Sequence, residues 1–264
     1  MYDFSYTKPI CLADAVLALN GLDAKALAGG QSFIPVLKQR LNRPSLVVDL
    51  AGLGLSGITV SDDAVTIGAT TTHAAVAANS DVQKAFPALA CLAAGIGDLQ
   101  VRHRGTIGGS LANNDPAADY PAVALATAAT LHTTTRTLTA DEFFQGMFTT
   151  ALEPDEIITA VSFPIPHQAA YVKFRNPASR YAMVGVFVAR GEPGVRVAVT
   201  GAGQNGVFRH AAMEQALSRS WSPAALEGIA TPAEGLNSDI HGSADYRAHL
   251  VGVMAKRAVG LAES

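Results

Sequence analysis

The chain has 264 residues, of which 49% are hydrophobic and 16% charged, with a formal net charge of −3. The large apolar fraction supplies a sizeable core and excludes a largely disordered chain, and the length suits two compact domains or one large one. A near-neutral charge without a long basic run argues against nucleic acid as the main partner. No uncharged apolar stretch of about 18 residues occurs and the N-terminus lacks a signal-peptide pattern, so we expect a cytoplasmic protein without a transmembrane segment.

Alternating short strands and helices fill the chain as far as Pro164-Ile-Pro166. The expected strands cover residues 24–28, 46–50, 65–69, 130–135 and 157–163. The expected helices cover residues 12–20, 32–41, 73–78, 80–85, 87–96 and 120–129. We expect the strand over 24–28 and the Ala- and Leu-rich helix over 87–96 to be buried. Residues 101–119 are expected to form a long polar loop, and loops of that length in compact domains are usually functional.

The pattern changes after Pro166. Three β-leaning runs are spaced like a meander, over residues 170–175, 182–189 and 195–200, with turns at 176–177 and 191–194. Helical patterns follow over residues 209–218, 223–229 and 243–260. Strands followed by helices on one face predict a small α+β domain.

Two stretches with adjacent glycines stand out. Gly29-Gly30 follows the first strand of a strand–helix–strand unit, with Ser32 as a suitable helix N-cap. Gly108-Gly109 is followed by hydroxyl, amide and carboxylate groups, a proline and a helix start. Glycine lets a backbone approach a ligand closely, and unpaired N–H groups at a helix start bind anions such as a diphosphate. A lone Gly-Gly is more often only a turn, but two such stretches favour a ligand site.

Cysteine and histidine usage offers no metal site. Cys11 and Cys91 do not form a Cys-x-x-Cys pair, and no His-x-x-x-His pair occurs among the seven histidines. An iron–sulfur cluster held by this chain alone would need about four cysteines. We expect no metal bound by this chain.

Ala28-Gly-Gly-Gln-Ser-Phe-Ile-Pro35 and Thr106-Ile-Gly-Gly-Ser-Leu-Ala-Asn-Asn-Asp-Pro-Ala-Ala-Asp119 together resemble the FAD-binding (medium) subunit of the molybdenum hydroxylase / xanthine dehydrogenase family. The likeness is strongest to the carbon monoxide dehydrogenase type and extends over essentially the whole chain. It implies an α+β fold with a two-part FAD-binding domain of the para-cresol methylhydroxylase-like type over residues 1–166, its subdomains covering about 1–54 and 55–166. A C-terminal flavoprotein domain with a three-stranded sheet and helices is implied over residues 167–264.

The resemblance also implies one non-covalently bound FAD. Matching the family motifs places these residues beside the cofactor: Ala28, Gly29, Gly30, Gln31, Ser32, Phe33, Ile34, Thr71, Thr72, Thr106, Ile107, Gly108, Gly109, Ser110, Asn114, Asp115, Asp119, Lys173 and Tyr181. Two loops of bare N–H groups can neutralise a diphosphate without a lysine, and a tyrosine ring can shield one face of the flavin.

Purely structural roles stay open for several of these side chains. The hydroxyls of Thr71 and Thr72 often only cap a helix, Asp119 is equally a helix cap, and Tyr181 is equally a core aromatic. The sequence also departs from the commoner family pattern, with Arg180 where Asp often precedes Tyr181 and His103 where Asn is frequent.

The implied function is electron transfer within a larger enzyme, without a catalytic residue of this chain on the substrate. A molybdopterin-binding large subunit would hydroxylate the substrate, and a small subunit with two [2Fe-2S] clusters would pass electrons to FAD and on to an external acceptor. The implied assembly is a dimer of heterotrimers.

Three other functions are weaker. A stand-alone FAD-dependent oxidase of a small organic substrate usually has a longer cap domain, and many attach the flavin through a histidine where Gln31 stands here. A flavin-free interaction module would not need both glycine loops intact. A nicotinamide dehydrogenase would need Gly-x-Gly-x-x-Gly at a strand–helix junction.

Overall fold

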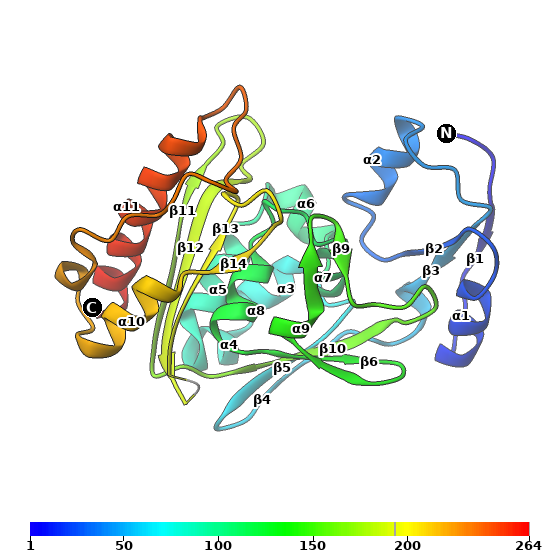
Figure 1. Cartoon of the computed structure of the whole chain (residues 1–264). Helices are drawn as coiled ribbons and strands as arrows, with labels where there is room; N and C mark the ends of the chain where they lie inside the picture. Colours follow the sequence, from blue (N-terminus) through cyan, green and yellow to red (C-terminus); the bar gives the residue numbers. More distant parts are fainter. Residues whose placement is uncertain (193, 264) are drawn as a thin grey trace.

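The computed structural model describes residues 1–192 and 194–263 and packs them into three units. A small N-terminal unit and the C-terminal helices lie at opposite ends of the molecule, and a central unit of helices over a sheet lies between them (Figure 1). The described sheets have the strand orders β1-β3-β2, β4-β5-β10-β6-β7, β11-β12-β13-β14 and β8-β9.

The N-terminal unit is a parallel sheet with crossover helices. Its strands are β1 (Ser5–Thr7), β2 (Ala24–Leu27) and β3 (Leu46–Asp49), and its helices are α1 (Leu12–Leu19) and α2 (Phe33–Lys38). β2 pairs in parallel with β3 across α2, which confirms the predicted strand–helix–strand unit. The expectation that β2 is buried was wrong, because β2 is an edge strand and only its Ala24 is buried.

The central unit is an antiparallel sheet covered by helices (Figure 1). Its strands are β4 (Ile58–Val60), β5 (Ala64–Gly68), β6 (Thr130–Thr133), β7 (Thr137–Thr139) and β10 (Ile158–Pro164). Its helices are α3 (His73–Ala78), α4 (Ser80–Ala85), α5 (Pro87–Ala94), α6 (Leu99–Arg104), α7 (Ile107–Asn113), α8 (Tyr120–Ala126) and the short α9 (Ala140–Phe143). The hairpin of β8 (Phe144–Gly146) and β9 (Thr149–Thr150) completes it. The 3-10 turn η1 (Leu50–Gly52) follows β3 directly, and its Leu50 packs in the core of the N-terminal unit.

The long polar loop expected over residues 101–119 is largely helical instead. Two short helices, α6 and α7, cover much of this stretch, and a side chain caps the start of each. Asp98 Oδ1 accepts from Val101 N at the start of α6, and Thr106 Oγ1 accepts from Gly109 N at the start of α7. The glycines of α7 are compatible with a helix because they allow close packing: a Cβ on Gly108 would lie 2.6 Å from Ala69 Cβ. Tertiary packing therefore overrides the low helix propensity of glycine here.

The C-terminal unit contains the expected meander. Its strands are β11 (Gln168–Arg175), β12 (Ala182–Gly191) and β13 (Gly194–Thr200), and a short β14 (Phe208–Arg209) adds a fourth. Its helices are α10 (Ala211–Arg219), η2 (Pro223–Leu226) and α11 (Ala244–Glu263). Pro193 of the expected turn over 191–194 lies outside the described residues.

Both faces of the C-terminal sheet are buried, each in a different hydrophobic core. α11 packs against β11 and β12, whereas α8 packs against β12 and β13 from the other side. Phe187 and Ala198 accordingly belong to the central core, while Val186 and Val197 belong to the C-terminal core. Burial on both faces explains why β12 is an almost unbroken apolar run.

No helix of the described ranges 1–192 and 194–263 is long and apolar enough to cross a membrane. Within those ranges no three His, Cys, Asp or Glu side chains gather as metal ligands, and Cys11 and Cys91 are exposed and free. What the described surface does offer is a cavity at which all three units meet.

Candidate functional site

The cavity has a volume of about 610 Å³ and is bounded by segments far apart in the sequence. The loop over residues 28–33 forms one side, the start of α7 another, and residues 179–181 of the β11–β12 turn a third. Leu152 and Ile157 add an apolar wall from the segment before β10. A concave, mostly apolar site with a few convergent polar groups is the usual form of a cofactor pocket.

Free backbone donors distinguish the first glycine loop. The N–H groups of residues 30–33 have no acceptor among the described residues, and the hydrogen bonds of α2 begin with Ile34 N donating to Gly30 O. Gly30 has φ +74 and Ser32 lies in the right-handed region, so the chain reverses tightly here. Consecutive free N–H groups in such a turn form a concave site for an anion.

The amides at the start of α7 are already paired, contrary to the expectation of two loops of bare N–H groups. Ile107 N donates to Thr71 O and Gly108 N donates to Ala69 O at 2.8 Å. A helix start buried inside a protein must satisfy its donors, and here they tie α7 to the end of β5. The first loop therefore supplies the free donors, and the second supplies shape and the Ser110 side chain.

The two glycine loops are packed backbone to backbone. A Cβ on Gly29 would collide with the carbonyl oxygen of Arg104 and lie 2.8 Å from Gly105 Cα. A Cβ on Gly105 would lie 2.6 Å from His73 Nε2. Glycine is required at both positions because no side chain fits between the segments.

The structure brings most of the proposed cofactor residues to the lining of this one cavity. Those lining the cavity are Ala28, Gly29, Gly30, Gln31, Ser32, Phe33, Thr106, Gly108, Gly109, Ser110, Asp115, Asp119 and Tyr181. Those off the wall are Ile34, Thr71, Thr72, Ile107, Asn114 and Lys173.

Several of the off-wall side chains have internal partners. Thr72 Oγ1 accepts from Ala75 N and caps α3, as the capping alternative expected. The Thr71 hydroxyl donates to Gly57 O and accepts from Gly57 N. Ile107 is fully buried in the central core.

Asp119 forms a buried charge network rather than a side-chain helix cap. Its carboxylate accepts from Tyr171 Oη at 2.5 Å and from Lys173 Nζ at 2.8 Å, and it makes no side-chain cap hydrogen bond to α8. Burial raises the pKa of Asp119, and the Lys173 ammonium opposes that rise. Burial and the neighbouring Asp119 carboxylate hold the pKa of Tyr171 well above its usual value. The cavity wall therefore carries a carboxylate whose charge Lys173 balances.

Comparison with known proteins identifies the family. Residues 2–166 match the model described as the FAD binding domain in molybdopterin dehydrogenase, and residues 169–262 match the CO dehydrogenase flavoprotein C-terminal domain. The chain belongs to this flavoprotein family. The expected family, the α+β fold class and the presence of an FAD-binding domain are thereby confirmed.

Relatives of the flavoprotein match it along nearly its whole length. The carbon monoxide dehydrogenase medium chain of Afipia carboxidovorans is 34% identical over 99% of this chain and 97% of its own. The nicotine 6-hydroxylase medium subunit of Paenarthrobacter nicotinovorans is 36% identical over 96% and 95%. Quinoline 2-oxidoreductase from Pseudomonas putida 86 superposes with a TM-score of 0.88 at 30% identity, covering 99% of this chain and 97% of that one.

His73 is a cavity residue of the flavoprotein that sequence reasoning missed. It is 5% exposed, its ring lies 5.3 Å from that of Tyr120, and Nδ1 has no hydrogen-bond partner among the described residues. Burial, reinforced by the charge of Arg102, lowers its pKa to about 4. The imidazole is therefore neutral at pH 7. The sequence signal that could have indicated His73 is its position as the first residue of α3, directly after the capping Thr72.

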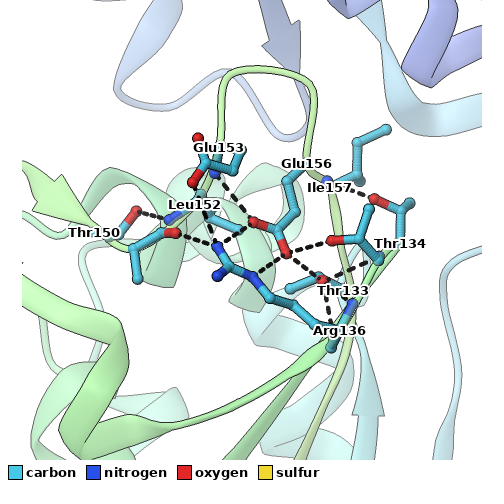
Figure 2. Close-up of polar contacts among 10 residues, drawn as sticks. Thr133, Thr134, Arg136, Thr150, Leu152, Glu153, Glu156 and Ile157 are labelled. Atoms are coloured by element: carbon cyan, nitrogen blue, oxygen red, sulfur yellow. Dashed lines mark hydrogen bonds and ion pairs between the residues drawn. The ribbon is translucent and has the colours of Figure 1, made fainter.

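Glu156 is a second missed residue, and it anchors the apolar wall of the flavoprotein's cavity. The carboxylate of Glu156 accepts from the Thr133 and Thr135 hydroxyls and from Glu153 N. Arg136 donates to both carboxylate oxygens of Glu156 (Figure 2). Arg136 Nη2 also donates to Ala151 O at 2.6 Å. This cluster fixes the segment that brings Leu152 onto the wall. No local pattern could reveal it, since the partners lie on separate turns.

Protonation of Glu156 at low pH is expected to weaken this hydrogen-bonded cluster and to lower the stability of the fold. The Arg136 guanidinium and the hydroxyl donors lower the pKa of Glu156 to about 2, from an ordinary value of 4.5. A carboxylate with a depressed folded-state pKa adds stability above pH 4.5 that is lost as the pH falls toward 2. Urea midpoints measured across this window should fall in the wild type and fall less in Arg136→Gln. An equally steep fall in that variant would contradict the assignment.

Proposed function

We propose that the flavoprotein binds one FAD in this cavity and acts as the electron-transfer subunit of a molybdenum-containing hydroxylase or dehydrogenase. The observation that carries the proposal is the run of free N–H groups at residues 30–33, because these four residues line the cavity together with residues of the second glycine motif. Such a run fits a diphosphate, because backbone donors stabilise an anion without a lysine.

The described residues around the cavity also fit a planar cofactor. The residues proposed to hold FAD are those of the two glycine motifs that line the wall, and Tyr181, 47% exposed there, offers a ring that can cover one face of the flavin. This exposure of Tyr181 supports a role at the cavity over a place in the hydrophobic core. FAD, when bound, takes up and releases electrons, while the protein positions it and tunes its potential.

The partners are proposed from the relatives. These are named medium chains or medium subunits, and one solved relative is a Cu,Mo-CO dehydrogenase. We infer a molybdopterin-binding large subunit and a small subunit with [2Fe-2S] clusters, assembled with this chain as a dimer of heterotrimers in the cytoplasm. Electrons would pass from the clusters through the bound FAD to an external acceptor.

The proposal is tested on the purified chain and on the native complex. The chain is expected to be yellow and to release free FAD on acid treatment, and a pull-down from the native host should recover iron–sulfur and molybdenum subunits. A colourless chain that takes up no added FAD would overturn the proposal. Substrate-linked turnover by the chain alone would favour the stand-alone oxidase instead.

A further inference from the structure

The tip of the β8–β9 hairpin places an aromatic residue, Phe148, on the cavity wall outside both glycine motifs. Phe148 is nevertheless 58% exposed. Its neighbour Met147 is 54% exposed and does not line the cavity. An exposed large apolar side chain at the mouth of a binding cavity is suited to contact with a ligand.

Asn114 holds this tip from both sides. Its side-chain Nδ2 donates to Gly146 O at 2.7 Å and to Thr149 O at 2.9 Å, and its own carbonyl accepts from Phe148 N at 3.1 Å. Asn114 is 1% exposed and ends α7, the helix that carries Gly108 and Gly109. The hairpin tip is therefore tied to the same helix as the second glycine motif.

The backbone at Phe148 is held in an unfavourable conformation. Its φ of +53 lies in the left-handed region, which bulky residues rarely occupy. Arg180, next to the aromatic Tyr181 on the same cavity wall, has φ +63. Strained residues of this kind persist where surrounding contacts over-determine them, and they concentrate at ligand sites. Here the surrounding contacts are the three hydrogen bonds of Asn114.

We propose that Phe148 is a binding residue for FAD, with its ring against a planar ring system of the cofactor, and that Asn114 is the positioning residue that fixes it. This inference rests on the proposed placement of FAD in the cavity. Aromatic faces stack on planar heterocycles, and pre-ordering a ring lowers the entropy lost on binding. Asn114, expected from the motif to contact the cofactor, acts through Phe148 instead.

The test is FAD titration into the apoprotein of the full chain, followed by calorimetry and by the visible flavin spectrum. Phe148→Asn removes the ring and suits a positive φ, because asparagine enters the left-handed region readily. We expect its dissociation constant to rise roughly tenfold, the size of one lost aromatic contact with its buried area. Phe148→Tyr should restore most of the affinity, and the matched surface control Met147→Ala should bind FAD as the wild type does.

A double-mutant cycle separates positioning from simple structural support. Asn114→Ala should weaken FAD binding in the wild-type background but add little in the Phe148→Asn background, because both changes remove the same contact. Additive losses would overturn the positioning role. Thermal melts of each apoprotein run alongside, so that a change in folding is measured separately.

The outcomes distinguish this inference from the placement of FAD on which it rests. Gly30→Val serves as the reference, since it acts on the free amides of the first loop. Wild-type binding by Phe148→Asn, together with lost binding by Gly30→Val, overturns the role of Phe148 and leaves the cavity as the FAD site. Wild-type binding by both variants overturns the placement of FAD itself.

Discussion

Gly30→Val is expected to abolish FAD retention while leaving most of the fold intact. Gly30 has φ +74, and a Cβ there would lie 2.5 Å from Ile34 Cδ1. A β-branched side chain strongly disfavours a positive φ, so the turn must rotate and redirect the free N–H groups of residues 30 and 31. Losing two hydrogen bonds to a charged group costs about 3 to 6 kcal/mol. That corresponds to a dissociation constant raised on the order of 100-fold or more.

A matched control separates lost binding from backbone strain. Gly228 has φ +75 and a Cβ there would meet nothing within 4 Å, but it lies in the C-terminal unit away from the cavity. Gly228→Val therefore introduces a comparable conformational penalty without touching the donors. Flavin content and FAD affinity, measured for both variants, should fall only for Gly30→Val. Equal flavin content in the two purified variants would argue against the first loop as the anion site.

Local patterns accounted for the parts of the fold in which sequence neighbours interact. The strand–glycine–helix–strand order gave the β2–α2–β3 unit, and the alternation of apolar runs and turns gave the C-terminal meander. The short strands β4 and β7 were not predicted, because three residues give too little periodicity to recognise a strand. α7 was not predicted because Gly108 and Gly109 indicate a loop until the packing of Gly108 against Ala69 is known. α6 was not predicted because its six residues are too few to show a clear helical period.

The site was predictable where the glycine motifs lie and not where distant segments complete it. The motifs located the wall, but the sequence could not show that α7 pairs its amides with Ala69 and Thr71. Glu156 and Phe148 depend on contacts between segments that no local pattern connects. Which groups remain free is decided by tertiary packing.

Asp119→Ala is expected to be the most destabilising single change at the site. The Asp119 and Lys173 side chains are 4% and 3% exposed and form a 2.8 Å ion pair. Removing the carboxylate leaves a buried ammonium without its counter-charge and the Tyr171 hydroxyl without its acceptor. Breaking a buried pair in this way costs about 3 to 5 kcal/mol. Urea denaturation of the apoprotein should show a midpoint lowered accordingly.

Replacing both partners tests whether the loss comes from the unpaired charge. Asp119→Leu combined with Lys173→Met removes both charges and fills similar volume, and such replacements of buried pairs are often neutral or stabilising. The double variant should therefore recover much of the stability that Asp119→Ala loses. If it is as unstable as the single variant, the cost arises from packing around α8 and not from the stranded ammonium. Lys173→Met alone should also be destabilising, since it leaves a buried carboxylate with Tyr171 as its remaining hydrogen-bond donor.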